Sequence, residues 1–346
     1  MSKISHKVKN HNMANPIDLS KDYSVKEQCI RESYSHYEDS ILRFLLESFL
    51  PHKDIVIPSI KSNICNIPTQ DSFVWFGHSS YMLWLNGKSI LFDPLIGDNA
   101  SPLPYMFRAF NGADIFSAGD FGSIDYLIIT HNHYDHLSKA SILALKDKIK
   151  CIIVPLGIGK ILRKWGMCSH HIVELDWGEN ISFEYLKIHC LPTKHYSARS
   201  LFDKNMSLWA CFVVQGGDER NGYKNIFCSG DSGYGGHFRV IGEQFLHIDF
   251  AFIENGQYNM RWAQNHLFPH ETLQAAIDIR CKRLMPIHNS KFALAPHHFA
   301  QPLESLCALY DLEKKDYPFL LLTPRIGEIL PLWEDISTMR WWEQTT

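Results

Sequence analysis

The sequence predicts an α/β protein made of two similar halves. In residues 126–166 short β-rich runs alternate with helical patterns, and the same alternation returns in residues 225–287. Each half opens with strands and closes with helices, which is the pattern of a layered α/β domain. The composition agrees with this class, because 45% hydrophobic and 21% charged residues are ordinary for a globular chain with a sizeable core.

A change of character near residue 70 divides the chain. Residues 1–69 are predicted to form an amino-terminal extension that is polar at first and helical over residues 24–49. Strand-like runs begin at residue 73, and Asn86-Gly87 between two of them is the strongest short-range hairpin signal. Residues 70–346 are therefore expected to form the main domain.

The order of elements in the main domain follows from their hydrophobic periodicity. Strands are predicted at residues 73–77, 81–85, 89–92, 126–130, 151–155, 188–192, 225–228, 249–253 and 283–287. Helices are predicted at residues 138–149, 158–166, 237–246 and 270–280. No short-period repeat and no low-complexity linker separates the two halves.

Charge and cysteine content limit the partners and the compartment. A formal net charge of −3 provides no basic field for a polyanion, so nucleic acid is not expected as a partner. Nine cysteines without a CxxC pair, and an amino terminus without an apolar run, favour a reducing cytoplasm. Residues 41–50, the longest apolar stretch near the start, are far too short to span a membrane.

Four potential metal ligands stand in one short loop. His131, His133, Asp135 and His136 follow a predicted strand and precede a predicted helix. Residues two apart in an extended loop point the same way, so His131 and His133 can close on one metal ion. Asp135 and His136 then project toward a second position, which suits a two-metal site. The alternative is a polar loop with chance histidines, and the HxHxDH spacing after an apolar strand argues against it.

Further ligands are expected at later strand ends, because four side chains cannot complete two coordination spheres. His195, Asp231 and His288 each follow a predicted strand. A carboxylate at position 231 can bridge two metals with its two oxygens. Each residue alone would more often be a satisfied polar group, but their common position favours metal ligation.

The order HxHxDH, His, Asp, His resembles the metallo-β-lactamase superfamily. Other segments are similar to its branch that contains N-acyl-phosphatidylethanolamine-hydrolysing phospholipase D. These segments are Phe76-Gly77-His78-Ser79-Ser80, Asp93-Pro94, residues 130–137, Glu174-Leu175-Asp176-Trp177, Gly230-Asp231-Ser232-Gly233-Tyr234 and residues 287–294. The resemblance covers residues 70 to 330. It implies a four-layer αβ/βα metallo-β-lactamase sandwich, with residues 70–346 as the catalytic domain behind an amino-terminal helical appendage.

The resemblance also implies a ligand set and a cofactor of two Zn²⁺ ions per chain. One ion would be held by His131, His133 and His195, the other by Asp135, His136 and His288, with Asp231 bridging. A hydroxide between the ions would be the nucleophile at neutral pH. The candidate catalytic residues are Asp135, Asp231 and His266. Redox relatives carry a carboxylate where His133 stands, so hydrolysis is favoured.

The implied function is that of a metal-dependent phosphodiesterase of phospholipase D type, acting on N-acyl-phosphatidylethanolamine-like lipids. A lactonase of the ascorbate-6-phosphate type shares the ligand pattern and attacks a carbonyl carbon instead. A metal-binding, lipid-sensing module without turnover is the alternative from another class, and the intact ligand set argues against it. The expected partner is a lipid or small-molecule phosphodiester. The amino-terminal helix could pair two subunits or dock on a membrane surface, and its composition does not decide between a homodimer and peripheral membrane contact.

Several other residues have two interpretations. His266 matches a family histidine at the substrate pocket, although Asn265 replaces the glutamine of the phospholipase. The resemblance makes Asp93 a partner of a ligand, and His78 either a support of the metal site or a buried structural histidine. Certain aromatic residues could line an acyl groove or pack the core, namely Tyr105, Phe107, Phe110, Phe116, Trp262 and Phe268. The loop 101–108 contains two prolines among apolar residues, so it is expected to be exposed and is the candidate lipid-facing element.

Overall fold

A computed structural model describes part of the chain. The described residues are 48–49, 55–97, 99–103, 105–168, 170–200, 202–218, 222–312 and 317–344. The chain divides into two units, Met1–Ile41 and Leu42–Thr346, and all described residues belong to the second. The predicted helix at residues 24–49 lies outside the described residues except for its last two positions, which form a turn. The extension boundary near residue 70 stays a prediction.

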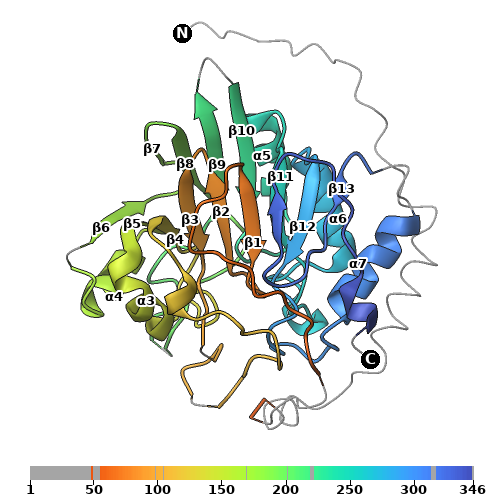
Figure 1. Ribbon diagram of the computed structural model, residues 1–346, viewed down its shortest axis with the longest axis horizontal. Helices are drawn as coiled ribbons and strands as arrows, with labels where there is room; N and C mark the ends of the chain where they lie inside the picture. The colour runs from red at the N-terminus through yellow and green to blue at the C-terminus, as the bar shows by residue number, and fades with distance from the viewer. Residues whose placement is uncertain are drawn as a thin grey trace, which may run out of the picture. The chain divides into compact units, whose positions relative to one another are not determined.

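Two seven-stranded sheets form the centre of the second unit (Figure 1). The first has the order β14-β1-β2-β3-β4-β5-β6 and the second β13-β12-β11-β10-β9-β8-β7. The strands of the first sheet are β14 (Ile329–Pro331), β1 (Ser72–Trp75), β2 (Tyr81–Leu85), β3 (Lys88–Phe92), β4 (Ile124–Ile128), β5 (Ile149–Pro155) and β6 (His171–Leu175). Those of the second are β13 (Leu320–Leu321), β12 (Arg283–Ile287), β11 (Phe250–Glu254), β10 (Gly222–Cys228), β9 (Cys211–Asp218), β8 (Leu186–Leu191) and β7 (Asn180–Ser182).

Helices cover the outer faces of the two sheets. They are α3 (Lys139–Leu145), α4 (Ile158–Lys164), α5 (His237–Phe245), α6 (Pro269–Asp278) and α7 (Gln301–Leu312), with short 3-10 turns η1 (Ala118–Asp120), η2 (Lys146–Lys148), η3 (Met260–Trp262) and η4 (Trp341–Gln344). Figure 1 shows α3 and α4 beside the first sheet and α6 and α7 beside the second. No helix in the described ranges is long and apolar enough to cross a membrane.

The side chains of each strand alternate between the two faces of its sheet. They form three apolar layers, one between the two sheets and one between each sheet and its helices. Phe73 of β1 packs with Phe252 of β11 in the core between the sheets. Its neighbour Val74 points the other way and packs with Ile142 of α3 and Ile158 of α4. A third cluster joins the second sheet to α5, α6 and α7. Because strand side chains alternate between faces, each sheet can bury both of them, and the result is a four-layer αβ/βα sandwich.

The strands and helices predicted between residues 73 and 287 are confirmed in type and differ at their ends. The Asn86-Gly87 hairpin joins β2 to β3, with φ values of 52° and 71° at the turn. The helix predicted to reach residue 149 ends as α3 at Leu145 and continues as η2, because the chain must enter β5 at Ile149. The elements that sequence reasoning did not predict include β6, β7, β9 and α7, together with β13 and β14.

Candidate metal centre

The predicted ligands converge, although they come from distant parts of the chain. His131, His133, Asp135 and His136 lie in the loop between β4 and α3. His195, Asp231 and His288 follow β8, β10 and β12. Two groups of potential ligands contain all seven residues, with the ligand atoms of each group within 4.8 Å of one another.

The first group contains His131, His133, His195 and Asp231. Nδ1 of His133 lies 2.9 Å from Nε2 of His131 and 3.2 Å from Nε2 of His195. Oδ2 of Asp231 lies 3.7 Å from Nε2 of both His131 and His195. In a tetrahedral zinc site with bonds of about 2.0–2.1 Å, neighbouring ligand atoms are about 3.3 Å apart. The observed spacings lie on either side of that value, so this group fits one tetrahedral ion.

The second group contains Asp135, His136 and His288, and the structure adds His78 to it. Nε2 of His136 lies 3.4 Å from Oδ2 of Asp135 and 3.1 Å from Oδ1 of Asp231. Nδ1 of His288 lies 3.2 Å from Oδ1 of Asp231. Both His136 Nε2 and Asp231 Oδ1 are buried and have no hydrogen-bond partner within the described residues. Such buried, unpartnered polar atoms are unfavourable unless a ligand satisfies them, and a metal ion would do so.

Hydrogen bonds behind the group orient the imidazole rings. Oδ2 of Asp93 lies 2.7 Å from Nδ1 of His136, which leaves Nε2 of that ring for a metal. Asp93 also accepts hydrogen bonds from the Thr130 main-chain N–H and hydroxyl at 2.8 Å and 2.6 Å. Nδ1 of His195 lies 3.1 Å from the Asn265 carbonyl oxygen, so Nδ1–H donates and Nε2 faces the first group. These contacts agree with the expected role of Asp93 as a partner of a ligand.

Four of the clustered histidines are neutral at pH 7. Burial lowers the pKa values of His131, His195 and His288 well below the usual value. Burial also lowers the pKa of His133 to about 4. Neutral imidazoles offer the lone pairs that a divalent cation needs.

The carboxylates of the centre carry buried negative charge. Burial raises the pKa of Asp231 above its usual value, and the positive field of His136 only partly opposes the rise. The pKa of Asp135 lies well below its usual value, because His136 and His78 outweigh the effect of burial. The pKa of His136 is raised well above its usual value, because Asp231, Asp135 and Asp93 outweigh burial. A divalent cation between these groups would compensate the charge that burial penalises.

Two turns at the centre have strained backbones and brace each other. His78 and His288 have φ values of 54° and 67°, in the left-handed region that non-glycine residues seldom adopt. The His288 N–H donates to the His78 carbonyl, and the His78 N–H donates to the Asn289 carbonyl, both at 2.9 Å. His78 is fully buried, and its Nε2 lies 2.9 Å from Oδ2 of Asp135. Of the two interpretations of His78, this contact favours a support of the metal site.

Glu254 is the site residue that sequence reasoning missed. It ends β11, is fully buried, and belongs to a third group with Asp231, His266 and His288. Its Oε2 lies 2.9 Å from Nδ1 of His266. Nδ1 of His266 lies 3.9 Å from Oδ2 of Asp231, which places the predicted catalytic histidine beside the centre. A carboxylate at a strand end was the signal used for Asp231, and the same rule applied to residue 254 could have found it.

The aromatic residues divide between core and surface. Phe110, Phe116 and Phe268 are at most 5% exposed, so they pack the interior and do not line an open groove. Leu103 and Tyr105 in the loop 101–108 are exposed as expected, because their side chains are 51% and 65% accessible, whereas Phe107 of the same loop is half-buried. The interpretation that these aromatic residues line an acyl groove is therefore wrong for the three buried phenylalanines, whose side chains pack in the core.

A two-sheet sandwich with a cluster of histidines and carboxylates at its strand ends defines a class of metal-binding α/β proteins. The chain belongs to the metallo-β-lactamase superfamily: the Beta-lactamase superfamily domain matches residues 88–289. N-acyl-phosphatidylethanolamine-hydrolyzing phospholipase D 1 of Caenorhabditis elegans is 30% identical over 311 residues, which cover 84% of this chain and 82% of that protein.

Other relatives agree with the family and the fold. An uncharacterized protein of Mycobacterium bovis is 33% identical over 243 residues, which cover 69% of this chain. The match spans 64% of the length of that protein. Isothiocyanate hydrolase from Delia radicum gut bacteria has a similar structure, with a TM-score of 0.58 and 18% identity over 75% of this chain and 98% of that one.

Proposed function

We propose that this protein is a di-zinc phosphodiesterase of phospholipase D type that acts on N-acyl-phosphatidylethanolamine-like lipids. The main observation that supports this proposal is the position of Asp231 between two groups of candidate ligands. Its Oδ2 faces Nε2 of His131 and His195 at 3.7 Å, and its Oδ1 lies 3.1 Å from Nε2 of His136. One carboxylate can therefore contact two ions through different oxygens.

The donor set supports zinc and a count of two. Imidazole nitrogens and carboxylate oxygens are the ligands of many zinc sites, and a single tetrahedral ion would leave at least three of the seven candidates unused. The candidates are His131, His133, Asp135, His136, His195, Asp231 and His288. When bound, the two ions would supply positive charge for a phosphate and lower the pKa of a water molecule toward neutrality.

The residues of the chain would hold and orient the reacting groups. Asp231 would keep the two ions together, and Asp135 would hold the second ion from a position fixed by His78 at 2.9 Å. His266 is 16% exposed, and its Nδ1 is engaged by Glu254, which leaves Nε2 for a substrate. From there an Nε2–H can donate its proton to the leaving alcohol oxygen as the bond between that oxygen and phosphorus breaks, while the oxygen of a water molecule that has lost a proton to solvent joins phosphorus.

A lipid phosphodiester is supported by two further observations. The Caenorhabditis elegans relative is a phospholipase by name and matches 84% of this chain. The exposed apolar residues Leu103 and Tyr105 provide a surface that a small sugar-phosphate lactone would not need.

Metal analysis followed by a substrate screen tests the proposal. We expect two zinc ions per purified chain and cleavage of long-chain N-acyl-phosphatidylethanolamine, with phosphodiester, lactone and thioester compounds compared side by side. A reproducible single metal per chain would contradict the two-metal site. Efficient opening of a phosphorylated lactone without cleavage of long-chain phosphodiesters would favour a lactonase, and bound metal without any turnover would favour a sensing module.

A further inference from the structure

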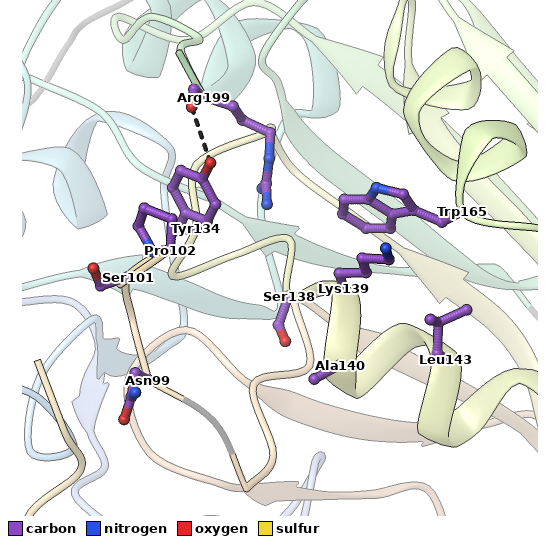
Figure 2. Close-up of a pocket in the computed structure, with 10 residues that line it drawn as sticks. All are labelled: Asn99, Ser101, Pro102, Tyr134, Ser138, Lys139, Ala140, Leu143, Trp165 and Arg199. Carbon is purple, nitrogen blue, oxygen red and sulfur yellow. Dashed lines mark hydrogen bonds between the residues drawn. The ribbon is translucent and has the colours of Figure 1, made fainter. Parts of the chain in front are cut away.

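A pocket of about 520 Å³ borders the loop that carries His131 to His136 (Figure 2). Residues of the loop before Leu103, of the metal-ligand loop, of α3 and of the segment after His195 line it. The side chains used below are Pro102, Tyr134, Lys139, Leu143, Trp165 and Arg199. The volume lies in the range of about 300–1,000 Å³ that is usual for small-ligand sites.

The guanidinium of Arg199 lies between two aromatic rings of this pocket, as Figure 2 shows. Its central carbon is 3.9 Å from the ring centroid of Tyr134 and 5.2 Å from that of Trp165. Nη1 donates to the carbonyl oxygens of Asn132 and Leu137, both at 2.7 Å. Arg199 is therefore a pocket wall and a clamp on the metal-ligand loop.

Within the part of the chain that the structure describes, no carboxylate forms an ion pair with Arg199 or Lys139. None of the described residues lining the pocket is acidic. Asp203 acts on Arg199 through space, but Oδ1 of Asp203 accepts the main-chain N–H groups of Arg199 and Ser200 at 2.8 Å and 2.7 Å. Burial lowers the pKa of Arg199, which reflects the cost of removing its charge from water. Lys139 adds a second cation at the same pocket. Two cations that share one concave surface, with no carboxylate among its described lining residues, favour an anionic ligand.

We infer that this pocket binds a phosphomonoester that carries an apolar body. Two cations suit the double charge of a phosphomonoester, and the planar guanidinium is suited to phosphate oxygens. Pro102, Leu143 and Trp165 provide apolar surface beside the charged groups. A lipid phosphomonoester and a soluble aromatic one share this chemistry. The lipid as the source of the ligand rests on the proposed function, because phospholipase D chemistry leaves a phosphomonoester on the lipid. The inference that the pocket binds a phosphomonoester does not depend on the proposed function.

Calorimetric titration of the zinc-loaded full-length protein tests this inference. The probes are octyl phosphate, phenyl phosphate and inorganic phosphate. We expect both organic probes to bind more tightly than inorganic phosphate, and Lys139→Glu to weaken them by about tenfold or more. Trp165→Ala should weaken them severalfold while having less effect on inorganic phosphate. Lys160→Glu reverses an exposed charge on α4 outside the pocket and should leave affinity unchanged.

The variant Asp231→Asn distinguishes binding of the probes at the metal centre from binding in the pocket. Asp231→Asn should weaken any phosphate that binds at the metals, while a Lys139-dependent binding event persists. Affinities that are equal in the wild type, Lys139→Glu and Trp165→Ala would overturn the inference. Preference for octyl phosphate supports the lipid source, and equal binding of phenyl phosphate supports a soluble ligand. If the protein binds these probes through Lys139 but cleaves no phosphodiester, the proposed function is refuted, whereas the inference that the pocket binds a phosphomonoester still holds.

Discussion

Nδ1 of His266 lies 2.9 Å from Oε2 of Glu254, a fully buried carboxyl group at the end of β11. The other oxygen, Oε1, accepts hydrogen bonds from the main-chain N–H groups of Ser232 and Leu267 at 2.8 Å and 3.0 Å. Burial raises the pKa of Glu254 well above its usual value, although both N–H groups oppose the rise. The carboxyl and the imidazole therefore share one proton, and this contact decides which nitrogen of His266 remains for a substrate.

Glu254→Gln is expected to reduce turnover about 10- to 100-fold with unchanged metal content. The glutamine oxygen can keep the two main-chain hydrogen bonds, but its NH₂ group can only donate to Nδ1 of His266, so the proton can no longer be shared between the two side chains. Kinetic constants and elemental analysis of the same preparation check this. Glu271→Gln, which changes another partly buried glutamate at the start of α6, is the control and should keep normal turnover. Loss of metal in Glu254→Gln would instead make the carboxyl group a ligand.

His266→Ala is expected to reduce turnover by about 10²- to 10⁴-fold, the range usual for a positioned acid or base. Metal content should stay intact, because His266 is absent from the two groups that hold the seven predicted ligands. His270→Ala removes a nearby histidine on α6 and should leave turnover near the wild-type value. If metal is lost together with activity in His266→Ala, the residue is a ligand or a structural support.

Asp231→Asn is expected to lower total metal content and activity together. The substitution removes one carboxylate oxygen, so the residue can no longer offer an anionic oxygen to both groups of ligands. Elemental analysis and turnover of the same sample measure both effects. Asp249→Asn changes another buried aspartate, whose Oδ1 pairs with Lys282 at 2.8 Å, and should affect stability without affecting metal content. Normal metal content and activity in Asp231→Asn would show that the bridging role is misassigned.

Arg199→Lys is expected to lower the free energy of unfolding by about 1–3 kcal/mol and to speed metal loss to a chelator. Lysine keeps the charge but cannot reproduce the two hydrogen bonds to the Asn132 and Leu137 carbonyls together with stacking on Tyr134. Denaturant titration and stopped-flow chelation measure the two effects. Arg163→Lys changes an exposed arginine paired with Glu174 and should cost about 0–1 kcal/mol. Equal metal release from both variants would exclude the clamp.

The metal-free protein is expected to lose stability as the pH falls from about 6.5 toward 4. Unfolded histidines take up protons near pH 6.5, whereas burial lowers the pKa values of His133, His237 and His297 to about 4 in the folded chain. The unfolded state therefore binds more protons in this window, and each such histidine contributes about 1.4 kcal/mol per pH unit. Burial raises the pKa values of Glu254, Asp231 and Glu271, so these groups favour the folded state as the pH falls. The buried histidines with lowered pKa values outnumber them, since this set also includes His78, His131, His195, His266 and His288.

Chemical denaturation of the metal-free chain at pH 7, 6 and 5 measures how steeply the free energy of unfolding changes with pH. His297→Asn removes one buried histidine whose Nε2 accepts a hydrogen bond from the Gln257 N–H, so the slope should become shallower even though overall stability falls. A stability that is constant between pH 7 and pH 5 would contradict the linkage.

The candidate ligands could be predicted from the sequence because their signals are local. His131 to His136 occupy one loop after an apolar strand, and the later ligands lie one to four residues after the end of a strand. Strand periodicity has a period of two, so it indicates where a strand ends and which residue emerges at the sheet edge. The two α/β halves and the Asn86-Gly87 hairpin depend on the same short-range patterns.

Only the tertiary structure decided which of these residues meet. His78 contacts Asp135 across 57 positions of sequence, Ser79 contacts His288 across 209, and β14 from the carboxyl-terminal end pairs with β1. The strand-end position of Glu254 is visible in the sequence, but its contact with His266 and the contacts of Arg199 appear only in three dimensions, since neither residue carries a local signal for its partner. Contacts over such separations depend on how the two sheets pack and on which strand ends converge, and hydrophobic periodicity determines the faces of a strand but not its neighbours.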